Sequence, residues 1–395
     1  MSFLKNGIYM KKEKQDIYQG FEQGPIRPPS ESNSLLLRFT RNCPWNRCTF
    51  CSVYNNKKFS LRSIDNILKD IELLNIYIDK IKQAFKDKKS IDQKEINKIY
   101  SSLENQNRQA FNAALQWYLS GMESIFLQDA NSLIIKPCDL IFLLEHIKKC
   151  FPDVKRITSY ARSHTIVRIK QNDLEQIAKA GLNRIHIGME SGSDIVLKNV
   201  NKGVDQKAHI EAGIKVKKAR IQLSEYVMPG LGGVKHSKEH AIQTALALNK
   251  INPDHIRLRT LAITRGTILC EQEENNEFEK PTDEIIAKEI KLFLQHLDNI
   301  TSYIKSDHIL NLFETIDGKM PEDKENMIGV IDDFLKLEPK NKVLYQVGRR
   351  MGFFKEPADL RNSLFLDKVK KTCELYQITP YNVDSFINGL MKNFV

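Results

Sequence analysis

Several features are missing from this chain of 395 residues. It has no run of 18 apolar residues, so no segment is predicted to cross a membrane as a helix. It begins without a basic start followed by an apolar core, and we therefore expect no secretory signal and a cytoplasmic location. The glycine-rich segment 226–233 is not followed by Lys and Ser or Thr, which argues against a phosphate-binding loop.

The overall composition excludes further classes of protein. Hydrophobic residues make up 41% and charged residues 28% of the chain, which is ordinary globular usage and excludes wholesale disorder. Lys and Arg number 60 against 49 Asp and Glu, giving a formal charge of +11. This excess fits an anionic partner such as a phosphate, a carboxylate-bearing small molecule or RNA, and it equally fits a solvated Lys-rich surface.

Short apolar or alternating segments alternate with helical patterns over much of the chain. We expect strands at residues 34–40, 124–128, 154–160, 183–189, 221–228 and 255–262. We expect helices between them at residues 139–150, 172–180, 206–219 and 238–249. This order predicts an α/β fold with a parallel sheet, either open or curled into a partial barrel. In both arrangements ligands bind at the carboxyl ends of the strands.

The chain divides into three predicted regions. Residues 1–33 contain Gly-Pro and Pro-Pro pairs and are expected to form an extended lead-in. Residues 34–280 carry the strand and helix alternation, with a helical insertion at about 60–120 formed by helices at 64–85 and 91–119 around a turn at 86–90. Residues 281–395 show no strand pattern and are expected to form a helical C-terminal region, with helices at 283–300, 307–316 and 321–335.

Three of the seven cysteines lie close together, directly after the first predicted strand. Cys43, Cys48 and Cys51 occupy nine positions, and the other four are isolated. In a chain that is not exported, such a trio suggests metal or cluster ligation. Three thiolates can hold three irons of a [4Fe–4S] cluster and leave the fourth iron open. A zinc site is the alternative, but it needs a fourth ligand, and no Cys or His follows closely.

The segment Cys-Pro-Trp-Asn-Arg-Cys-Thr-Phe-Cys resembles the cluster motif of the radical S-adenosylmethionine (SAM) superfamily, with Phe50 as the aromatic residue before the third cysteine. The first gap has four residues here and three in the family. Residues 181–193 closely resemble the fourth strand of barrels related to oxygen-independent coproporphyrinogen oxidases, methylthiotransferases and the Elongator catalytic subunit. That segment contains Gly188 and Glu190.

The resemblance implies a partial (β/α)6 barrel and a set of ligand contacts. Cys43, Cys48 and Cys51 would hold the cluster. Asp129 would accept a hydrogen bond from the SAM ammonium group. Ser159 and Arg162 would contact the ribose hydroxyls and the methionine carboxylate of SAM. Glu190 would lie near the ribose or the methionine, and Gly188 would allow the protein backbone to approach closely. No residue is singled out as catalytic.

The activity implied is that of an oxidoreductase that cleaves SAM reductively and generates a 5′-deoxyadenosyl radical. The radical would abstract hydrogen from an unidentified small-molecule or RNA substrate, with an external electron donor such as flavodoxin or ferredoxin and no membrane partner. Two alternatives stay open: a non-catalytic haem or cluster chaperone on the same barrel, and a tRNA-modifying enzyme. Arg257 and Arg259 share one face of the last predicted strand and either bind an anionic substrate or belong to the surface.

Overall fold

The computed structural model describes residues 16–85 and 93–391 of the chain. Its centre is an eight-stranded sheet in which all neighbouring strands are parallel, except that the last strand runs antiparallel to the strand before it. In spatial order these strands are β1 (Leu35–Arg38), β4 (Ser124–Gln128), β5 (Arg156–Ala161), β6 (Leu182–Glu190), β7 (Gln222–Val227), β8 (His255–Leu258), β9 (Tyr303–Lys305) and β10 (Asp317–Lys319).

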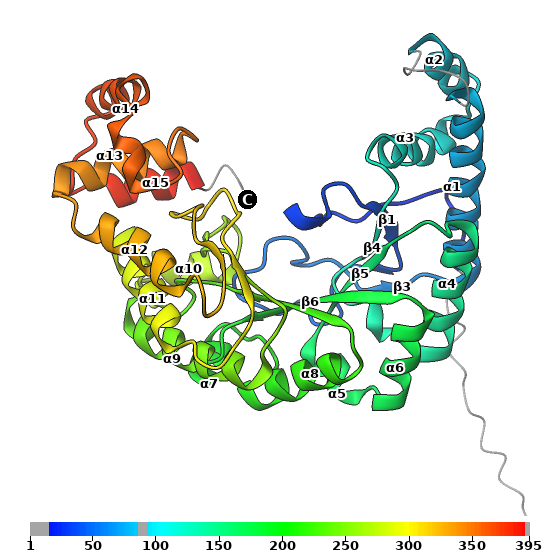
Figure 1. The fold of residues 1–395 in the computed structure, drawn as a ribbon, viewed down its shortest axis with the longest axis horizontal. Coiled ribbons are helices and arrows are strands. Elements are labelled where there is room, and N and C mark those ends of the chain that lie inside the picture. The colour runs from blue at the N-terminus through cyan, green and yellow to red at the C-terminus, as the bar shows by residue number, and fades with distance from the viewer. Residues whose placement is uncertain (1–15, 86–92, 392–395) are drawn as a thin grey trace, which may run out of the picture.

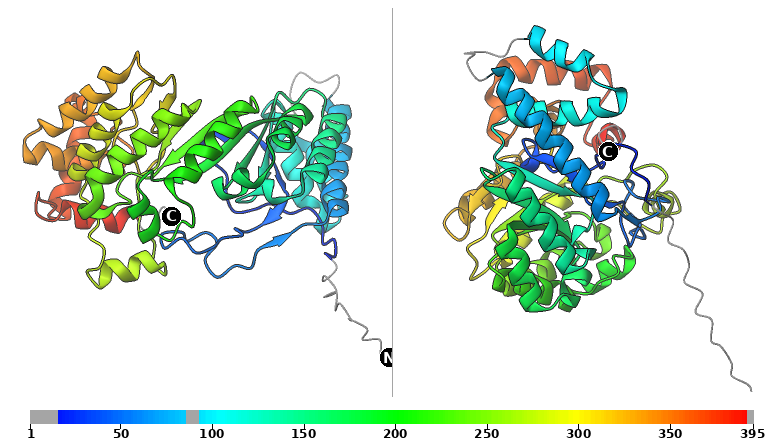
Figure 2. Two further views of the ribbon diagram at one scale, coloured as in Figure 1. Left: turned by 90° about the horizontal axis from the view of Figure 1, so that it is seen from below. Right: turned by 90° about the vertical axis from the view of Figure 1, so that its right-hand side faces the viewer.

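Helices cover the outer side of this curved sheet (Figure 1). They are α4 (Pro137–Cys150), α5 (Ser163–Arg168), α6 (Gln171–Ala180), α7 (Asp194–Asn199), α8 (Gln206–Lys218), α9 (Gly233–Ile251) and α11 (Asp283–His296). The short helix α10 (Ile268–Glu274) instead projects from the body of the fold (Figure 2). Local sequence sets several boundaries: the Asp205 side chain accepts from Ala208 N at the start of α8, and Gly181, at φ 127°, ends α6. The α/β partial barrel expected from the sequence is confirmed.

Further helices lie at the two opposite ends of the sheet (Figures 1 and 2). Next to β1 are α1 (Ile64–Phe85), α2 (Gln93–Ser101) and α3 (Asn105–Leu119); beyond β8 are α12 (Lys324–Leu335), α13 (Pro339–Arg350), α14 (Ser363–Leu375) and α15 (Val383–Met391). The helix predicted at 91–119 is therefore two helices, because the chain turns at Leu103 and restarts from an extended Glu104. Residues 91–92 and the predicted turn at 86–90 lie outside the described residues.

The prediction that no strand follows residue 280 is wrong. β9 and β10 extend the sheet, and the helix predicted at 307–316 does not form. Asp307, which was expected near a helix start, instead pairs with Arg257 of β8 at 2.9 Å. Strands of three residues are too short to show a periodic pattern, and only the pairing of β9 with β8 and of β10 with β9 defines them.

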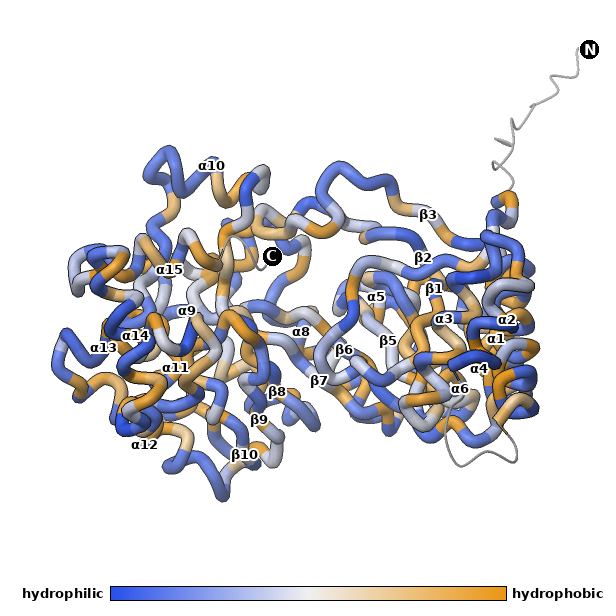
Figure 3. Tube along the Cα trace, turned by 90° about the horizontal axis from the view of Figure 1, so that it is seen from above, coloured by the Kyte–Doolittle hydropathy of each residue, from blue (hydrophilic) through white to orange (hydrophobic). Residues whose placement is uncertain are grey.

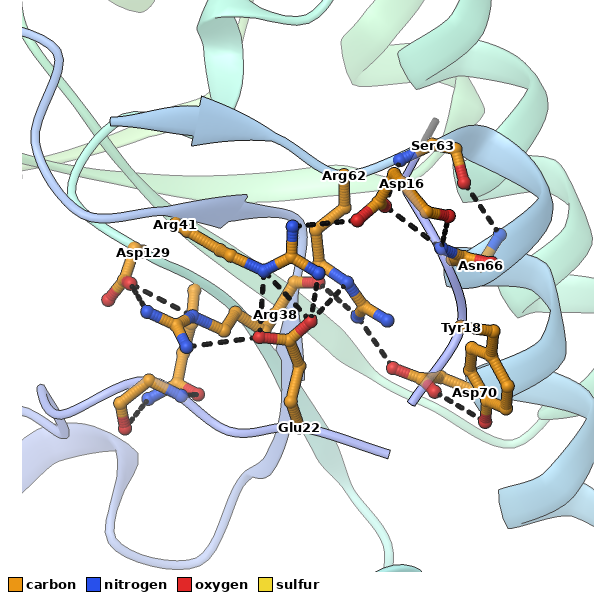
Figure 4. Close-up of polar contacts among 12 residues, drawn as sticks. Asp16, Tyr18, Glu22, Arg38, Arg41, Arg62, Ser63, Asn66, Asp70 and Asp129 are labelled. Carbon is orange, nitrogen blue, oxygen red and sulfur yellow. Dashed lines mark hydrogen bonds and ion pairs between the residues drawn. The ribbon is translucent and has the colours of Figure 1, made fainter. Parts of the chain in front are cut away.

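The lead-in follows an irregular course apart from a 3-10 turn, η1 (Pro29–Glu31), and it is anchored by ion pairs. Glu22 pairs with three arginines, from β1, β2 (Thr40–Arg41) and the segment after β3 (Ser60–Leu61), as Figure 4 shows. Glu31 is fully buried and contacts His186 and Arg156 beneath the sheet. Residues 1–15 of the predicted lead-in lie outside the described residues.

The distribution of hydropathy follows these layers. Apolar residues recur along the helices that flank the sheet, while the loops around α10 and near β3 are mostly hydrophilic (Figure 3). Within the described part of the chain, no helix combines the length and the apolar character needed to span a bilayer.

Candidate active site

A pocket lies at the carboxyl ends of the parallel strands, where ligands bind in folds of this type. It is lined by residues that the sequence places far apart: the cysteine loop between β2 and β3, the ends of β5 and β6, and the segments after β7 and β8. Six of the residues singled out from the sequence line this one pocket: Cys43, Cys48, Cys51, Arg162, Gly188 and Glu190.

The cysteine loop, residues 42–59, connects the two antiparallel strands β2 and β3, which form a small separate sheet. Asn46 adopts a φ of 46° inside the four-residue gap between the first two cysteines, and this left-handed turn accommodates the additional residue. The loop is fixed by backbone hydrogen bonds to two distant helices. Thr49 N donates to Val200 O at 3.0 Å, and Leu269 N donates to Thr49 O at 3.0 Å.

Trp45 clamps the same loop to the turn that follows α7. Its indole Nε1 donates to Asn201 O at 2.7 Å, and the guanidinium of Arg162 lies 5.0 Å from its ring centroid. Gly203, at φ 70°, lies directly against the ring, where a Cβ would meet a Trp45 carbon at 2.2 Å. The tryptophan therefore ties the cysteine loop to the end of β5 and to the turn before α8 through one side chain.

The three thiols are free and partly exposed to the pocket. Burial raises the pKa of Cys48 to about 11, against the opposing effect of Lys202 and Arg162. No three His, Cys, Asp or Glu side chains among residues 16–85 and 93–391 are close enough to hold one metal ion. All three cysteines line the one pocket, and in a [4Fe–4S] cubane three thiolates would each bind a different iron.

Glu190 and Lys202 form a pair on the β6 side of the pocket. Glu190 has a φ of 64°, which turns its side chain so that Oε1 accepts from Lys202 Nζ at 3.0 Å. A Cβ on Gly188 would meet Glu190 Oε1 at 2.3 Å, so glycine is required there by the position of the carboxylate. Burial lowers the pKa of Lys202, but Glu190 and Cys48 outweigh it and the net shift is upward. Lys202 is therefore a fixed cation beside the cysteine loop.

Arg162, at the end of β5, is held from two directions. Its Nη2 donates to Lys202 O at 2.8 Å, and its backbone N donates to Asn131 Oδ1 at 3.1 Å. Burial lowers its pKa, and the neighbouring Cys43 and Cys48 oppose that shift. The guanidinium consequently lies between the tryptophan clamp and the cysteines.

Asp129 and Ser159 do not line the pocket. Asp129 is buried, and both of its carboxylate oxygens are engaged: Oδ2 accepts from Arg38 and from Asn42 N, and Oδ1 accepts from Tyr54 Oη (Figure 4 shows the arginine contact). Ser159 is also buried, and its hydroxyl donates to Tyr160 O at 3.0 Å. Their predicted contacts with SAM stay predictions, and in this structure both residues support the strand ends.

Residues 104–245 match the family model described as the radical SAM superfamily. The matched segment runs from the start of α3 into α9 and contains Asp129, Ser159, Arg162, Gly188, Glu190 and Lys202. The three pocket cysteines precede it.

Several solved structures resemble this chain at low identity. The archaeal Elp3 of Methanocaldococcus infernus is 16% identical with a TM-score of 0.41, covering 57% of this chain and 58% of that one. Methylornithine synthase PylB is 12% identical with a TM-score of 0.40, covering 70% and 67%. HydG, a maturase of the [FeFe]-hydrogenase, is 11% identical with a TM-score of 0.41, covering 92% and 82%. No curated protein matches the chain.

The superfamily whose model matches residues 104–245 in general cleaves SAM with a [4Fe–4S] cluster. Sequence reasoning missed two residues of this pocket. Lys202 stands in a polar turn and carries no motif signal. His209, on α8, is buried, and its Nδ1 lies 2.8 Å from Ser163 Oγ. Only the folded chain brings either residue to the pocket.

Proposed function

We propose that this chain cleaves SAM reductively at a [4Fe–4S] cluster held by Cys43, Cys48 and Cys51. The observation that carries the proposal is the joint presence of these three free thiols with Arg162 and Glu190 around one pocket at the carboxyl ends of the strands. When bound, the cluster supplies an electron, received from an external one-electron donor, that divides SAM into methionine and a 5′-deoxyadenosyl radical able to take a hydrogen atom from a substrate.

The chain's own residues orient SAM in this proposal. Lys202 fixes one oxygen of Glu190, and the other oxygen forms no hydrogen bond within the described chain, so it is available to a ribose hydroxyl. Arg162 uses one nitrogen on Lys202 O and keeps further N–H donors for a carboxylate. Asp129 receives no role at SAM because its oxygens are already bound by Arg38, Asn42 and Tyr54.

The pocket walls also exclude water from the reacting atoms. Phe50, Tyr160, Met228 and Leu261 line it from four different segments of the chain. Tyr160 is held neutral, because burial raises its pKa well above the usual value. A largely apolar enclosure protects a reactive radical from quenching.

The test is anaerobic reconstitution with iron and sulfide, followed by measurement of bound iron and of 5′-deoxyadenosine and methionine formed from SAM under a chemical reductant. We expect about four irons per wild-type chain, and loss of both iron and SAM cleavage in Cys43→Ala, Cys48→Ala and Cys51→Ala. Cys138→Ala is the matched control, since Cys138 is exposed on α4 and does not line the pocket.

Equal iron content in Cys43→Ala and Cys138→Ala would refute the cluster assignment. Haem binding at one equivalent, together with an absence of SAM cleavage in the iron-loaded protein, would instead favour a carrier function. Strongly salt-dependent tRNA binding would point to an RNA substrate.

A further inference from the structure

Two arginines of the β8 segment have different surroundings. Arg257 is buried and pairs with Asp307 at 2.9 Å, so its charge is satisfied within the fold. Arg259 follows the end of β8, is exposed, and lines the pocket. Its backbone N donates to Val227 O at 2.9 Å, which fixes the position of its main chain. Its guanidinium forms no ion pair or hydrogen bond with any residue that the structure describes.

Glu190 is the one acidic side chain among the described residues that line the pocket, and Lys202 pairs with it at 3.0 Å. Three cationic side chains, from Arg162, Lys202 and Arg259, therefore line the pocket with this single carboxylate. An oxyanion brought by a ligand would supply the counter-charge that the fold does not provide for Arg259.

Two hydroxyl groups beside Arg259 are also without partners. The side-chain oxygens of Thr260 and Thr264 are buried and accept or donate no hydrogen bond within the described residues, and both threonines line the pocket. Thr260 is 3% exposed, and its backbone N donates to Asn311 Oδ1 at 2.8 Å. A buried hydroxyl without a partner is unfavourable, so these groups are suited to bind a ligand that enters the pocket.

The wall next to these polar groups is apolar. Met228, Leu261, Ala262 and Leu310 line the pocket on this side. A ligand that contacts both surfaces has an apolar body and a charged end. We propose that Arg259, with the hydroxyls of Thr260 and Thr264, binds the oxyanion end of the substrate, a carboxylate or a phosphate, while the body of the substrate packs against this apolar wall.

The proposal rests on the proposed function, because it assigns the substrate side of the same pocket, but its residues are separate from those given to the cluster and SAM. Arg259, Thr260 and Thr264 follow β8, whereas the cysteines, Arg162 and Glu190 come from the loop after β2 and from the ends of β5 and β6. Binding of an oxyanion can therefore be measured without SAM cleavage.

The experiment uses small fragments as probes on the full chain, both as purified and after cluster reconstitution. Benzoate, hexanoate and phenyl phosphate are compared with the neutral benzamide by ligand-observed NMR titration, and the carboxylate and phosphate arms distinguish the two oxyanions. The variants are Arg259→Gln and Arg265→Gln. Arg265 is exposed a few residues later and does not line the pocket, which makes it the matched control.

We expect an oxyanion probe to bind wild type and Arg265→Gln more tightly than benzamide does. Arg259→Gln should weaken that binding roughly 10-fold or more, the usual loss for a charge-assisted hydrogen bond, with an unchanged melting temperature. The proposal is overturned if no oxyanion binds better than benzamide, or if Arg259→Gln binds the probes as wild type does. Failure of the cluster assignment would appear separately, as absence of iron and of SAM cleavage.

Discussion

The two sides of the pocket differ in how their charges are arranged. On the side of the cysteine loop, Arg162, Glu190 and Lys202 each bind another group of the protein. On the side of β8, Arg259 and the hydroxyls of Thr260 and Thr264 have no partner within the described residues. The first side is preorganised, as expected for a surface that receives the same cofactor in every turnover. The second keeps its polar groups for a molecule that arrives from outside.

The difference has a consequence for stability that mutations can measure. Groups that are paired within the fold contribute to both folding and function, so changing them lowers the free energy of unfolding. Groups reserved for a ligand leave that free energy nearly unchanged when they are replaced. The following predictions use this distinction, beginning with the largest expected effect.

Asp129 supports the cysteine-loop side from behind, and its replacement should be the most destabilising. Asp129→Asn removes the charge that faces Arg38 and places its amide NH2 against the donor of either Asn42 or Tyr54. We expect a loss of about 3–5 kcal/mol in the free energy of unfolding, measured by urea denaturation.

Asp153→Asn, in an exposed turn after α4, is the control and should stay within about 0.5 kcal/mol of wild type. A weaker affinity for SAM in Asp129→Asn with unchanged stability would show that Asp129 contacts the cofactor directly, as the sequence resemblance implies.

Lys202→Met tests the paired side at the pocket surface. The substitution keeps the length of the side chain and leaves the carboxylate of Glu190, 14% exposed, without its cation. We expect a loss of about 2–4 kcal/mol, whereas Arg259→Gln should change the free energy of unfolding by less than about 0.5 kcal/mol. Equal losses in the two variants would remove the distinction between the two sides.

Gly203→Ala tests the clamp between Trp45 and the turn after α7. The new methyl group overlaps the indole ring, and the backbone φ of 70° is unfavourable for alanine. We expect a loss of about 1–3 kcal/mol and a reduced iron content after reconstitution, because the cysteine loop is displaced. Gly329→Ala is the matched control: no atom lies within 4 Å of its added Cβ, and in the interior of α12 alanine should be neutral or stabilising.

The last effect concerns acid sensitivity on the paired side, and it is the smallest when it is expressed per pH unit. Burial lowers the pKa of His209 to about 3, from its usual value of 6.5 in an unfolded chain. Between pH 3 and pH 6.5 the unfolded chain binds a proton at His209 that the folded protein does not bind. The free energy of unfolding is therefore highest above pH 6.5 and decreases as the pH falls through this range. The loss is at most about 1.4 kcal/mol per pH unit.

His209→Gln should flatten this dependence in denaturation curves recorded at several pH values between about 4 and 7. An unchanged slope in that variant would assign the acid sensitivity to other groups.

The fold could be predicted from sequence wherever a strand carried a run of apolar residues. β4 was located to the residue, and the other strands of the parallel sheet up to β8 to within a few positions, because their buried runs stand between clear helical patterns. β9 and β10 could not be predicted, since three residues give no periodicity and Ile304 alone is buried in β9. The segment between them was assigned to a helix at 307–316; in the structure Asp307 pairs with Arg257.

The site was predictable to the extent that its residues follow strands. Arg162 and Glu190 stand at strand ends and reach the pocket. Asp129 also follows a strand, but its carboxylate turns away toward Arg38, and sequence position alone cannot give that direction. Lys202 could not be separated from the many other basic residues. For Arg257 and Arg259 the sequence left an anion-binding role and a surface role open, because only the tertiary contacts show which cation has a partner.

The attachment of the cysteine loop also constrains when, during synthesis of the chain, this loop can fold and receive iron. Trp45 reaches a backbone oxygen 156 positions further along the chain, and Thr49 is held by Val200 and Leu269. During synthesis the three thiols leave the ribosome well before any of these anchors exists. Iron delivered at that stage would meet an unsupported peptide, so maturation of the proposed metal centre is expected to follow synthesis and folding of the segment that carries Leu269.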